Sequence, residues 1–267
     1  MSMPDKKINI DCCCEFGYEL QLVIPYAYYL FQHNLLNRTT SCLNTKELYY
    51  FSNSHSEAYK TRRYNEPNVP NKTPHLKELN YEKYTPPPYK NIYKNDYFVY
   101  EKPLLIIHNK YNEEWSGPPV NYIDKPTLSE IFRLYSDKYT IIYLRPRPSH
   151  IVTDASPTHD LKESPILKLY NIIDGIELYE RTKQQYKIRN FNHFQLLIHA
   201  NCDNFISVQG GNCVLASYFG GTNIIYAKCG GELTHDSYNG HYGKYSGCNV
   251  LHSDNYPDLM KLIKNNF

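Results

Sequence analysis

The chain has 267 residues, of which 41% are hydrophobic and 21% are charged, and its formal net charge is +2. This composition is typical of a folded soluble protein, and the length allows one large core or two modest ones. The small net charge argues against a dedicated nucleic-acid binder, which would carry a strong basic excess on one face.

The chain shows no sign of a membrane or of an oxidising compartment. No stretch approaches the roughly 18–20 apolar residues of a membrane span, and the first residues lack the apolar segment of a signal peptide. Three of the eight cysteines, Cys12, Cys13 and Cys14, are consecutive, which makes a poor disulfide framework. The cysteines form no C-x-x-C pair, so a structural zinc site is not supported. We therefore expect a cytoplasmic protein with reduced thiols and no membrane span.

The N-terminal third begins with the pattern of an α/β domain. A short apolar run over 8–14 predicts a strand, Gly17 breaks it, and apolar residues at helical spacing up to Phe31 predict a helix. A second short strand is expected at 48–51. The segment 61–95, rich in Pro, Asn, Lys and Tyr, is expected to be irregular, either as a linker or as an excursion of the first domain.

From Lys102 onward, strand and helix patterns alternate. Expected strands are 102–111, 140–150, a weaker one at 168–174, 204–209 and 222–227; expected helices are 127–139, 190–202, 212–219 and one starting near Pro257. Such alternation predicts a mostly parallel sheet.

Polar side chains follow three of these strands. Ligands of open parallel sheets bind beyond the carboxyl ends of the strands, so residues there are candidates for a site. The candidates are His108, Asn109, Lys110, Arg145, Arg147, Gln209, Gly210, Gly211 and Asn212. Two arginines, a lysine and a glycine turn together favour a polyphosphate site.

The two glycine pairs predict different local structures. Gly210 and Gly211 precede a short helix, where free amides and a missing Cβ let a phosphate approach, and Asn212 is a suitable N-cap. The alternative for Gly210 and Gly211 is a plain tight turn. The alternative for Arg145 and Arg147 is that both are simply exposed arginines of a loop. Gly220–Gly221 follows the helix, which predicts a left-handed C-terminal turn. The glycine fingerprints of dinucleotide sites and P-loops are absent.

Three stretches carry a family resemblance. The segments "HANCDNFISVQGGNCVLASYFGGTNIIY", "CEFGYELQLVIPYAYYL" and "KPLLIIHNKYNEEW" resemble GT-B glycosyltransferases, including bacterial and large-DNA-virus enzymes of the exostosin-like and xylosyl- or fucosyltransferase-like kinds. The resemblance implies an α/β, GT-B-like fold of two compact Rossmann-like domains whose parallel sheets face a cleft. The acceptor-side domain would cover 1–98 and the nucleotide-sugar-binding domain 99–267, and the last helix can pack back on the first.

The implied function is transfer of a sugar, with xylose or a deoxyhexose as the best guess, from a UDP- or GDP-sugar to a hydroxyl of a glycan. No D-x-D follows a strand, so we expect metal-independent, inverting transfer with no cofactor beyond the nucleotide sugar. Two alternatives are a non-catalytic nucleotide- or carbohydrate-binding protein of the same fold and another sugar-nucleotide-processing α/β enzyme.

The resemblance also implies roles for particular residues. Arg145, Lys110 and the amides of 210–212 would stabilise the leaving diphosphate. The base would be one of Glu15, Glu19, His55 and Glu57, with Glu15 preferred. Asn109 and Glu114 could hold sugar or ribose hydroxyls, Trp115 could stack on a sugar or simply pack, and Asp174 would lie near the nucleobase.

Overall fold

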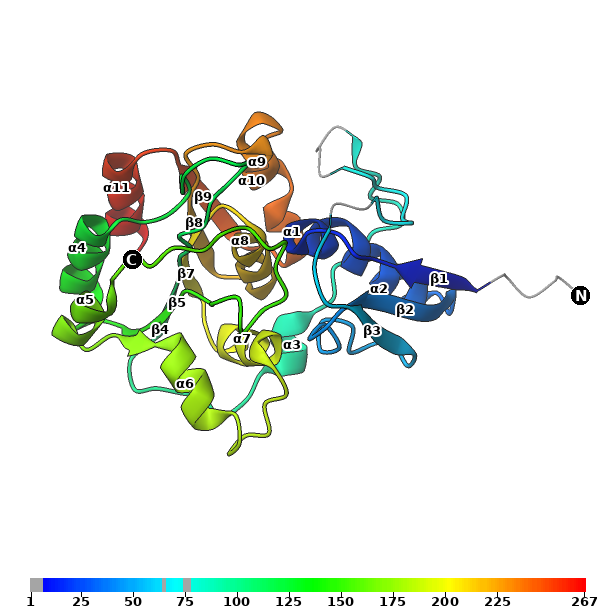
Figure 1. Ribbon diagram of the computed structural model, residues 1–267, viewed down its shortest axis with the longest axis horizontal. Coiled ribbons are helices and arrows are strands. Elements are labelled where there is room, and N and C mark those ends of the chain that lie inside the picture. Colours follow the sequence, from blue (N-terminus) through cyan, green and yellow to red (C-terminus); the bar gives the residue numbers. More distant parts are fainter. Residues whose placement is uncertain (1–6, 64–65, 74–77) are drawn as a thin grey trace, which may run out of the picture.

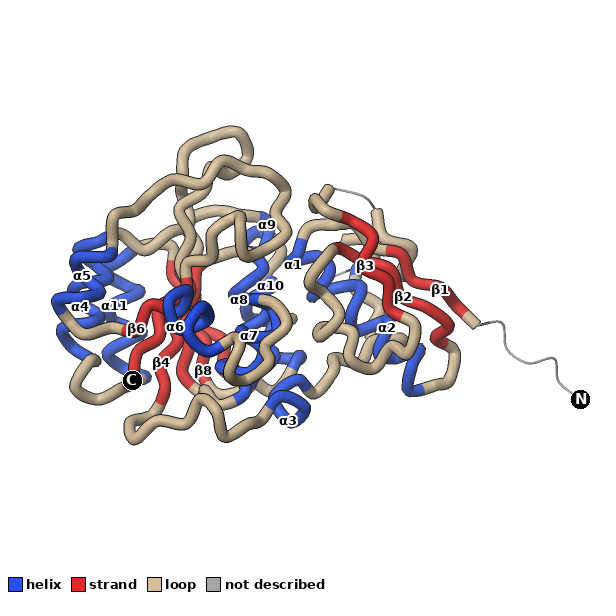
Figure 2. Tube along the Cα trace, turned by 60° about the horizontal axis from the view of Figure 1, so that its bottom comes forward, coloured by secondary structure: helices blue, strands red, loops and turns tan. Residues whose placement is uncertain are grey.

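The structure is a computed structural model that describes residues 7–63, 66–73 and 78–267, and it is an α/β protein with two parallel sheets (Figures 1 and 2). The strands are β1 (Ile8–Asp11), β2 (Leu36–Cys42), β3 (His55–Tyr59), β4 (Leu104–His108), β5 (Thr140–Leu144), β6 (Ile173–Asp174), β7 (Asn204–Val208), β8 (Thr222–Tyr226) and β9 (Asn249–Ser253). The α-helices are α1 (Phe16–Tyr18), α2 (Ile24–Gln32), α3 (Tyr89–Tyr93), α4 (Lys125–Tyr135), α5 (Ser164–Leu169), α6 (Gly175–Thr182), α7 (Phe191–Ala200), α8 (Gly211–Ala216), α9 (Gly231–Thr234), α10 (Ser237–Gly240) and α11 (Tyr256–Asn266). A π-helical segment η1 (Glu19–Val23) joins α1 to α2, and η3 (Ser217–Phe219) and η4 (Tyr242–Tyr245) are 3₁₀ turns.

The larger sheet has six parallel strands in the order β6-β5-β4-β7-β8-β9. The chain starts at β4, winds outward to β6, returns to place β7 beside β4, and winds outward again to β9. Numbered from β4, this is the 3-2-1-4-5-6 order of Rossmann-like folds. Their ligands bind where the winding direction reverses, which here is between the carboxyl ends of β4 and β7.

Helices cover both faces of this sheet because its strands are apolar on both sides. All five residues of β4 are buried. Leu105 and Ile107 belong to the core shared with α4, α5 and α11, whereas Leu104 and Ile106 belong to the core shared with α6, α7 and α8. The last helix, α11, therefore packs on the six-stranded sheet and beside α4, not on the N-terminal part.

The smaller sheet has three parallel strands in the order β1-β2-β3, covered by the α1-η1-α2 helix. The strand predicted at 48–51 is wrong, since Leu48, Tyr49 and Phe51 lie in turns and are buried there. Instead, β2 and β3 complete the sheet. Their sequences, LNRTTSC and HSEAY, are polar because both strands are partly exposed, so no apolar run marks them.

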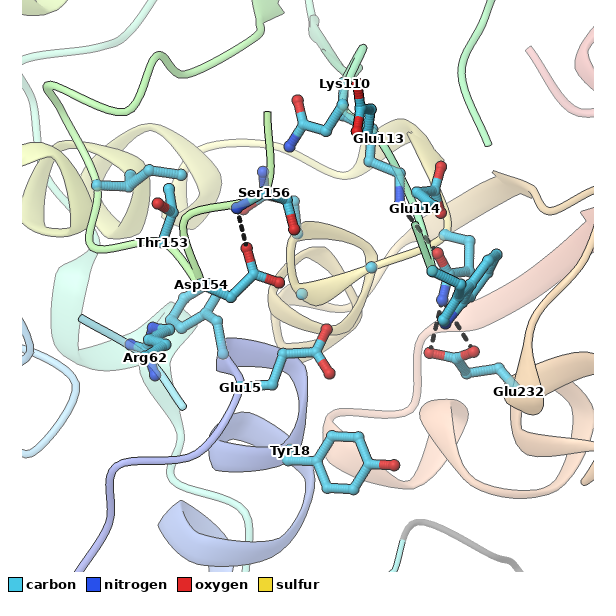
Figure 3. A pocket seen from close by; sticks show the side chains of 18 of the residues that line it. Glu15, Tyr18, Arg62, Lys110, Glu113, Glu114, Thr153, Asp154, Ser156 and Glu232 are labelled. Atoms are coloured by element: carbon cyan, nitrogen blue, oxygen red, sulfur yellow. Dashed lines mark hydrogen bonds and ion pairs between the residues drawn. The ribbon is translucent and has the colours of Figure 1, made fainter. Parts of the chain in front are cut away.

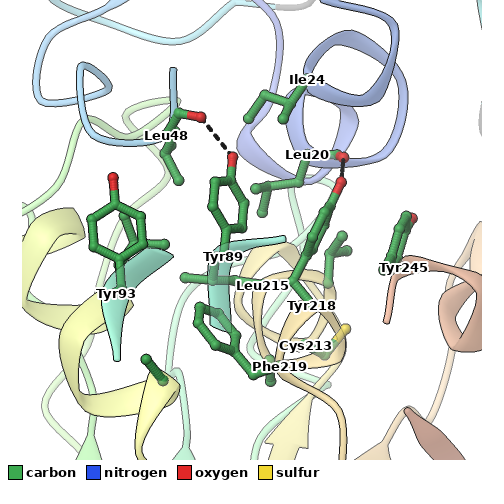
Figure 4. Close-up of a cluster of buried hydrophobic side chains, with 14 of the residues drawn as sticks. Leu20, Ile24, Leu48, Tyr89, Tyr93, Cys213, Leu215, Tyr218, Phe219 and Tyr245 are labelled. Atoms are coloured by element: carbon green, nitrogen blue, oxygen red, sulfur yellow. Dashed lines mark hydrogen bonds between the residues drawn. The ribbon is translucent and has the colours of Figure 1, made fainter. Parts of the chain in front are cut away.

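One hydrophobic cluster joins the two sheets (Figure 4). The Tyr89 ring of α3 packs 5.2 Å from the Tyr218 ring, between centroids. The Tyr89 hydroxyl donates to the carbonyl of Leu48 at 2.7 Å, and the Tyr218 hydroxyl donates to the carbonyl of Leu20. The irregular segment 61–95 thus ends in a helix that belongs to the contact between the sheets, so the two parts share a core.

Several local predictions from the sequence can be compared directly with the structure. Gly220 and Gly221, which follow the helix, have positive φ of 70° and 65°, although Gly220 is not left-handed helical because its ψ is −160°. A Cβ on Gly221 would lie 2.0 Å from the Asp203 carbonyl oxygen, so glycine is required there. Of the strand predicted at 168–174, only Ile173–Asp174 is extended, because α5 occupies the residues before it.

Two further expectations bear on the cysteines and the membrane. All eight cysteines, which lie within the described residues, are free thiols, and seven of them are buried. In the part of the chain that the structure describes, no helix combines the length and apolar character needed to cross a membrane.

Candidate functional site

A cavity of about 440 Å³ lies at the reversal of the larger sheet (Figure 3). It is lined by the start of the first helix, by the loops after β4 and β7, by residues of the loop after β5, and by α9. Nine predicted site residues line it: Glu15, Asn109, Lys110, Glu114, Trp115, Gln209, Gly210, Gly211 and Asn212. The smaller sheet therefore contributes its first helix to a site built on the larger one.

A polar network holds the Lys110 ammonium between the loops that follow β4 and β7, where the strand order of the sheet reverses. Lys110 Nζ donates to Glu114 Oε2 at 2.9 Å, after β4, and to Gln209 Oε1 at 3.0 Å, after β7. Gln209 Nε2 donates in turn to Glu232 Oε1 at 3.1 Å. Asn121 Nδ2 donates to Glu114 Oε2 at 2.8 Å. The network fixes the lysine beside the glycine turn.

That glycine turn brings α8, on the larger sheet, into backbone contact with α1, the first helix of the smaller sheet. Gly210 has φ of 128°, and a Cβ there would lie 3.4 Å from Lys110 Nζ. A Cβ on Gly211 would lie 2.6 Å from the Phe16 ring, and one on Gly17 would lie 3.6 Å from the Gly211 Cα. The predicted N-cap is corrected: α8 begins at Gly211 with Gly210 as its N-cap, so Asn212 lies inside the first turn.

Glu15 is the N-cap residue of α1, and its carboxylate points into the pocket (Figure 3). The pKa of this carboxyl is raised, first because the surrounding protein limits its hydration and then because Glu232 and Asp154 carry like charges. Lys110 and Arg62 oppose this shift. A carboxylate with a raised pKa is a stronger base, so Glu15 can accept a proton from a bound hydroxyl.

Arg62, which the sequence analysis missed, anchors the residues around Glu15. Its Nη1 donates to Cys14 O at 3.0 Å and to Glu19 Oε2 at 2.7 Å, and its Nε donates to Val152 O at 3.2 Å. Both charged side chains are buried. Glu19 is thereby committed to an internal ion pair and does not line the pocket, which gives no support to its use as the base.

The two other candidate bases also serve the structure of the smaller sheet. His55 lies 2.8 Å from Thr39 Oγ1 and 3.1 Å from Thr45 Oγ1, and burial lowers its pKa. Glu57 accepts hydrogen bonds from the amides of Thr45 and Lys46, at 2.7 and 2.9 Å. Neither side chain lines the pocket.

The predicted role of Arg145 in binding a diphosphate finds no support. Its guanidinium is bound by both carboxylate oxygens of Glu163, at 2.6 and 3.2 Å, and it does not line the pocket. Arg147 is exposed outside the pocket lining. Asp174 is the N-cap of α6 and accepts hydrogen bonds from Ile176 N and Glu177 N. The cations expected after β5 are therefore not part of this site.

His108 is a core residue and not a ligand contact. Its Nε2 lies 2.7 Å from Nε2 of His199, whose Nδ1 donates to the Gln195 carbonyl. Because a carbonyl can only accept, His199 Nε2 is the acceptor of this pair and His108 Nε2 carries its proton. Burial lowers both pKa values, so both rings are neutral. His108 lies outside the pocket lining.

Carboxylates outnumber cations around the pocket. Besides Glu15, the carboxylates are those of Glu113, Glu114, Asp154 and Glu232, and the cations are Lys110 and Arg62. Glu232 lies in α9, after β8, and Asp154 lies in the loop after β5; no short motif marks either residue. Among residues 7–63, 66–73 and 78–267, no group of three His, Cys, Asp or Glu side chains is arranged to hold a metal ion.

Comparisons of the chain with protein-family models, with curated proteins and with solved structures found no match in any of the three.

Proposed function

We propose that this protein is a glycosyltransferase that moves a sugar from a UDP- or GDP-sugar to a hydroxyl of a glycan. The observation that carries the proposal is that Glu15, from the first helix of the smaller sheet, shares one pocket with Lys110 and Gly210, at the reversal of the larger sheet. A base and a cationic glycine turn in one pocket are what transfer from a nucleotide sugar requires. The proposal includes a GT-B-like arrangement of domains 1–98 and 99–267 around this pocket.

The donor diphosphate would bind at Lys110 and Gly210. Gly210 has no side chain to keep a phosphate away, and the Lys110 ammonium lies directly over it. Lys110 is paired with Glu114, so a diphosphate would compete with that carboxylate for the ammonium. The cavity of about 440 Å³ is within the range of ligand pockets.

Glu15 would act as the base in a single displacement. The acceptor oxygen attacks the anomeric carbon, the bond from that carbon to the diphosphate breaks, and the hydroxyl proton passes to the Glu15 carboxylate. Positive charge from Lys110 and amides of the glycine turn would stabilise the leaving diphosphate without a metal. This order of events inverts the anomeric configuration.

The surplus of carboxylates favours a second candidate function. Five carboxylates face two cations, each of which already has a carboxylate partner, so an anionic ligand meets repulsion that a neutral sugar does not. A non-catalytic carbohydrate-binding protein of the same fold would bind saccharides and would not consume a nucleotide sugar.

Donor binding is tested by thermal shift with UDP, GDP and their sugars, with and without Mg²⁺ or Mn²⁺. We expect at least one nucleotide to raise the melting temperature without metal, and Lys110→Met to abolish that rise. The matched control is Lys138→Met, which removes a cation on the far side of the sheet, beside Tyr135. If no nucleotide stabilises the protein, the donor site is wrong; if stabilisation requires the metal, metal-independent binding is wrong.

A further inference from the structure

The sole tryptophan of the chain, Trp115, lines the rim of the pocket with 64% of its surface exposed. Its φ is 50°, and that of the following Ser116 is 62°. Positive φ is uncommon for any residue other than glycine and is a clear outlier for a bulky one. The chain thus holds its largest side chain in a strained backbone and leaves it in solvent.

The strain comes from a tight turn. Glu114 N donates to Gly117 O at 3.1 Å, and Gly117 N donates to Glu114 O at 2.8 Å, so Trp115 and Ser116 are the two central residues. A two-residue turn with both φ values positive prefers Asn-Gly. Trp-Ser at these positions lowers stability, and the exposed ring does not regain it by packing. Strained, exposed residues of this kind gather at ligand-binding sites.

The turn is also fixed in position, which suits a binding surface. The Glu114 carboxylate accepts hydrogen bonds from Lys110 Nζ at 2.9 Å and from Asn121 N at 2.9 Å, one from each side of the loop. Pro118 and Pro119 restrict the backbone between the turn and Asn121. The indole is therefore presented at the rim by an ordered loop.

We propose that Trp115 is a stacking surface for a sugar ring of an uncharged glycan, the acceptor in the proposed reaction, and this assignment rests on the proposed function. A sugar ring places an apolar face on the indole while its hydroxyls donate to nearby carboxylates. Glu113 and Glu114 precede the indole in the chain, and Glu232 lines the same pocket. These carboxylates can accept hydrogen bonds from the hydroxyls of a neutral sugar.

Because Trp115 is the only tryptophan, its fluorescence reports directly on this surface. The experiment titrates the protein with neutral saccharides (xylobiose, cellobiose, chitobiose and N-acetyllactosamine), both alone and with UDP or GDP already bound. We expect a saturable blue shift or quench with at least one saccharide, and the same response when UDP or GDP is already bound. The assignment fails if no saccharide changes the emission, or if bound UDP or GDP abolishes the saccharide response.

Variants separate a binding role from a structural one. Trp115→Ala should raise the acceptor KM about fivefold to tenfold and leave the donor KM unchanged, whereas Trp115→Phe should retain most of the affinity. The matched control is Leu169→Ala, which removes an exposed apolar side chain at the end of α5, outside the pocket lining. An unchanged acceptor KM in Trp115→Ala would contradict the assignment.

Trp115→Asn gives a readout that does not depend on activity. Asparagine tolerates positive φ, so this variant should melt at a higher temperature and lose the saccharide affinity measured by calorimetry. A lower melting temperature would show that Trp115 serves packing. If saccharides bind and no nucleotide does, the proposed glycosyltransferase function is overturned and the stacking surface is not. If a nucleotide binds through Lys110 and no saccharide binds, the stacking surface is overturned and the donor site is not.

Discussion

At the scale of single residues, Glu15 is the base of the proposed reaction, and its surroundings raise its pKa. Limited hydration raises that pKa most, and the charges of Glu232 and then Asp154 raise it further. A base works only when deprotonated, so activity should fall as the pH drops through the pKa of Glu15, which is raised from the ordinary glutamate value. Glu232→Gln removes a repelling charge, lowers that pKa, and should move the acid limb of kcat/KM to lower pH; Asp154→Asn should do so by less.

The matched control for this pH profile is Glu113→Gln. Glu113 also lines the pocket, but its charge is not among the causes of the Glu15 shift, and its carboxylate lies 3.2 Å from His159 Nε2. The acid limb of kcat/KM for Glu113→Gln should coincide with that of the unmodified protein. An acid limb that stays in place in Glu232→Gln would show that Glu15 is not the group that titrates.

At the scale of elements, the contact between α1 and α8 positions the base. A Cβ on Gly211 would lie 2.6 Å from the Phe16 ring and 3.2 Å from Gly17 N, so Gly211→Ala must push α1 away. Such overpacking should reduce the free energy of unfolding by about 1–3 kcal/mol, and it should lower activity by displacing Glu15. Chemical denaturation and initial rates measure the two effects.

Gly17, on the α1 side of the same contact, supplies the control variant. A Cβ on Gly17 would lie 3.6 Å from the Gly211 Cα, an ordinary van der Waals distance, and position 17 is helical. Gly17→Ala should therefore be neutral or slightly stabilising, because alanine favours a helix over glycine. Equal destabilisation by the two variants would contradict the packing described for this contact.

Most strands of the larger sheet could be predicted from the sequence, although β9 was not, whereas in the smaller sheet only β1 and the helix after it were predicted. Buried parallel strands such as β4 and β7 are apolar runs in the sequence, so their ends can be located. Lys110 and Gly210 follow those ends and could therefore be predicted as site residues. The polar strands β2 and β3 carry no such signal. Arg145 also follows a buried strand, but its partner Glu163 lies on a later loop, and no local pattern predicts that pairing.

At the scale of the whole molecule, the pocket depends on parts that are distant in the chain. Arg62 binds the carbonyls of Cys14 and Val152, which are 48 and 90 residues away, and so ties the loop after β5 to the start of the first helix. Long-range contacts of this kind explain why Arg62, Asp154 and Glu232 could not be assigned to the site from sequence patterns. The shared hydrophobic cluster holds both walls of the pocket in one folded unit.

The most direct test of the central claim is release of nucleoside diphosphate by Glu15→Gln with donor and acceptor present. We predict that turnover falls by about 100-fold or more, since general base catalysis is lost, while the thermal shift caused by the donor is unchanged. Glu130→Gln, which removes a partly exposed carboxylate of α4 outside the pocket lining, should turn over at the rate of the unmodified protein. Turnover at the full rate in Glu15→Gln would contradict the account, because no other carboxylate of the pocket has been assigned to the acceptor proton.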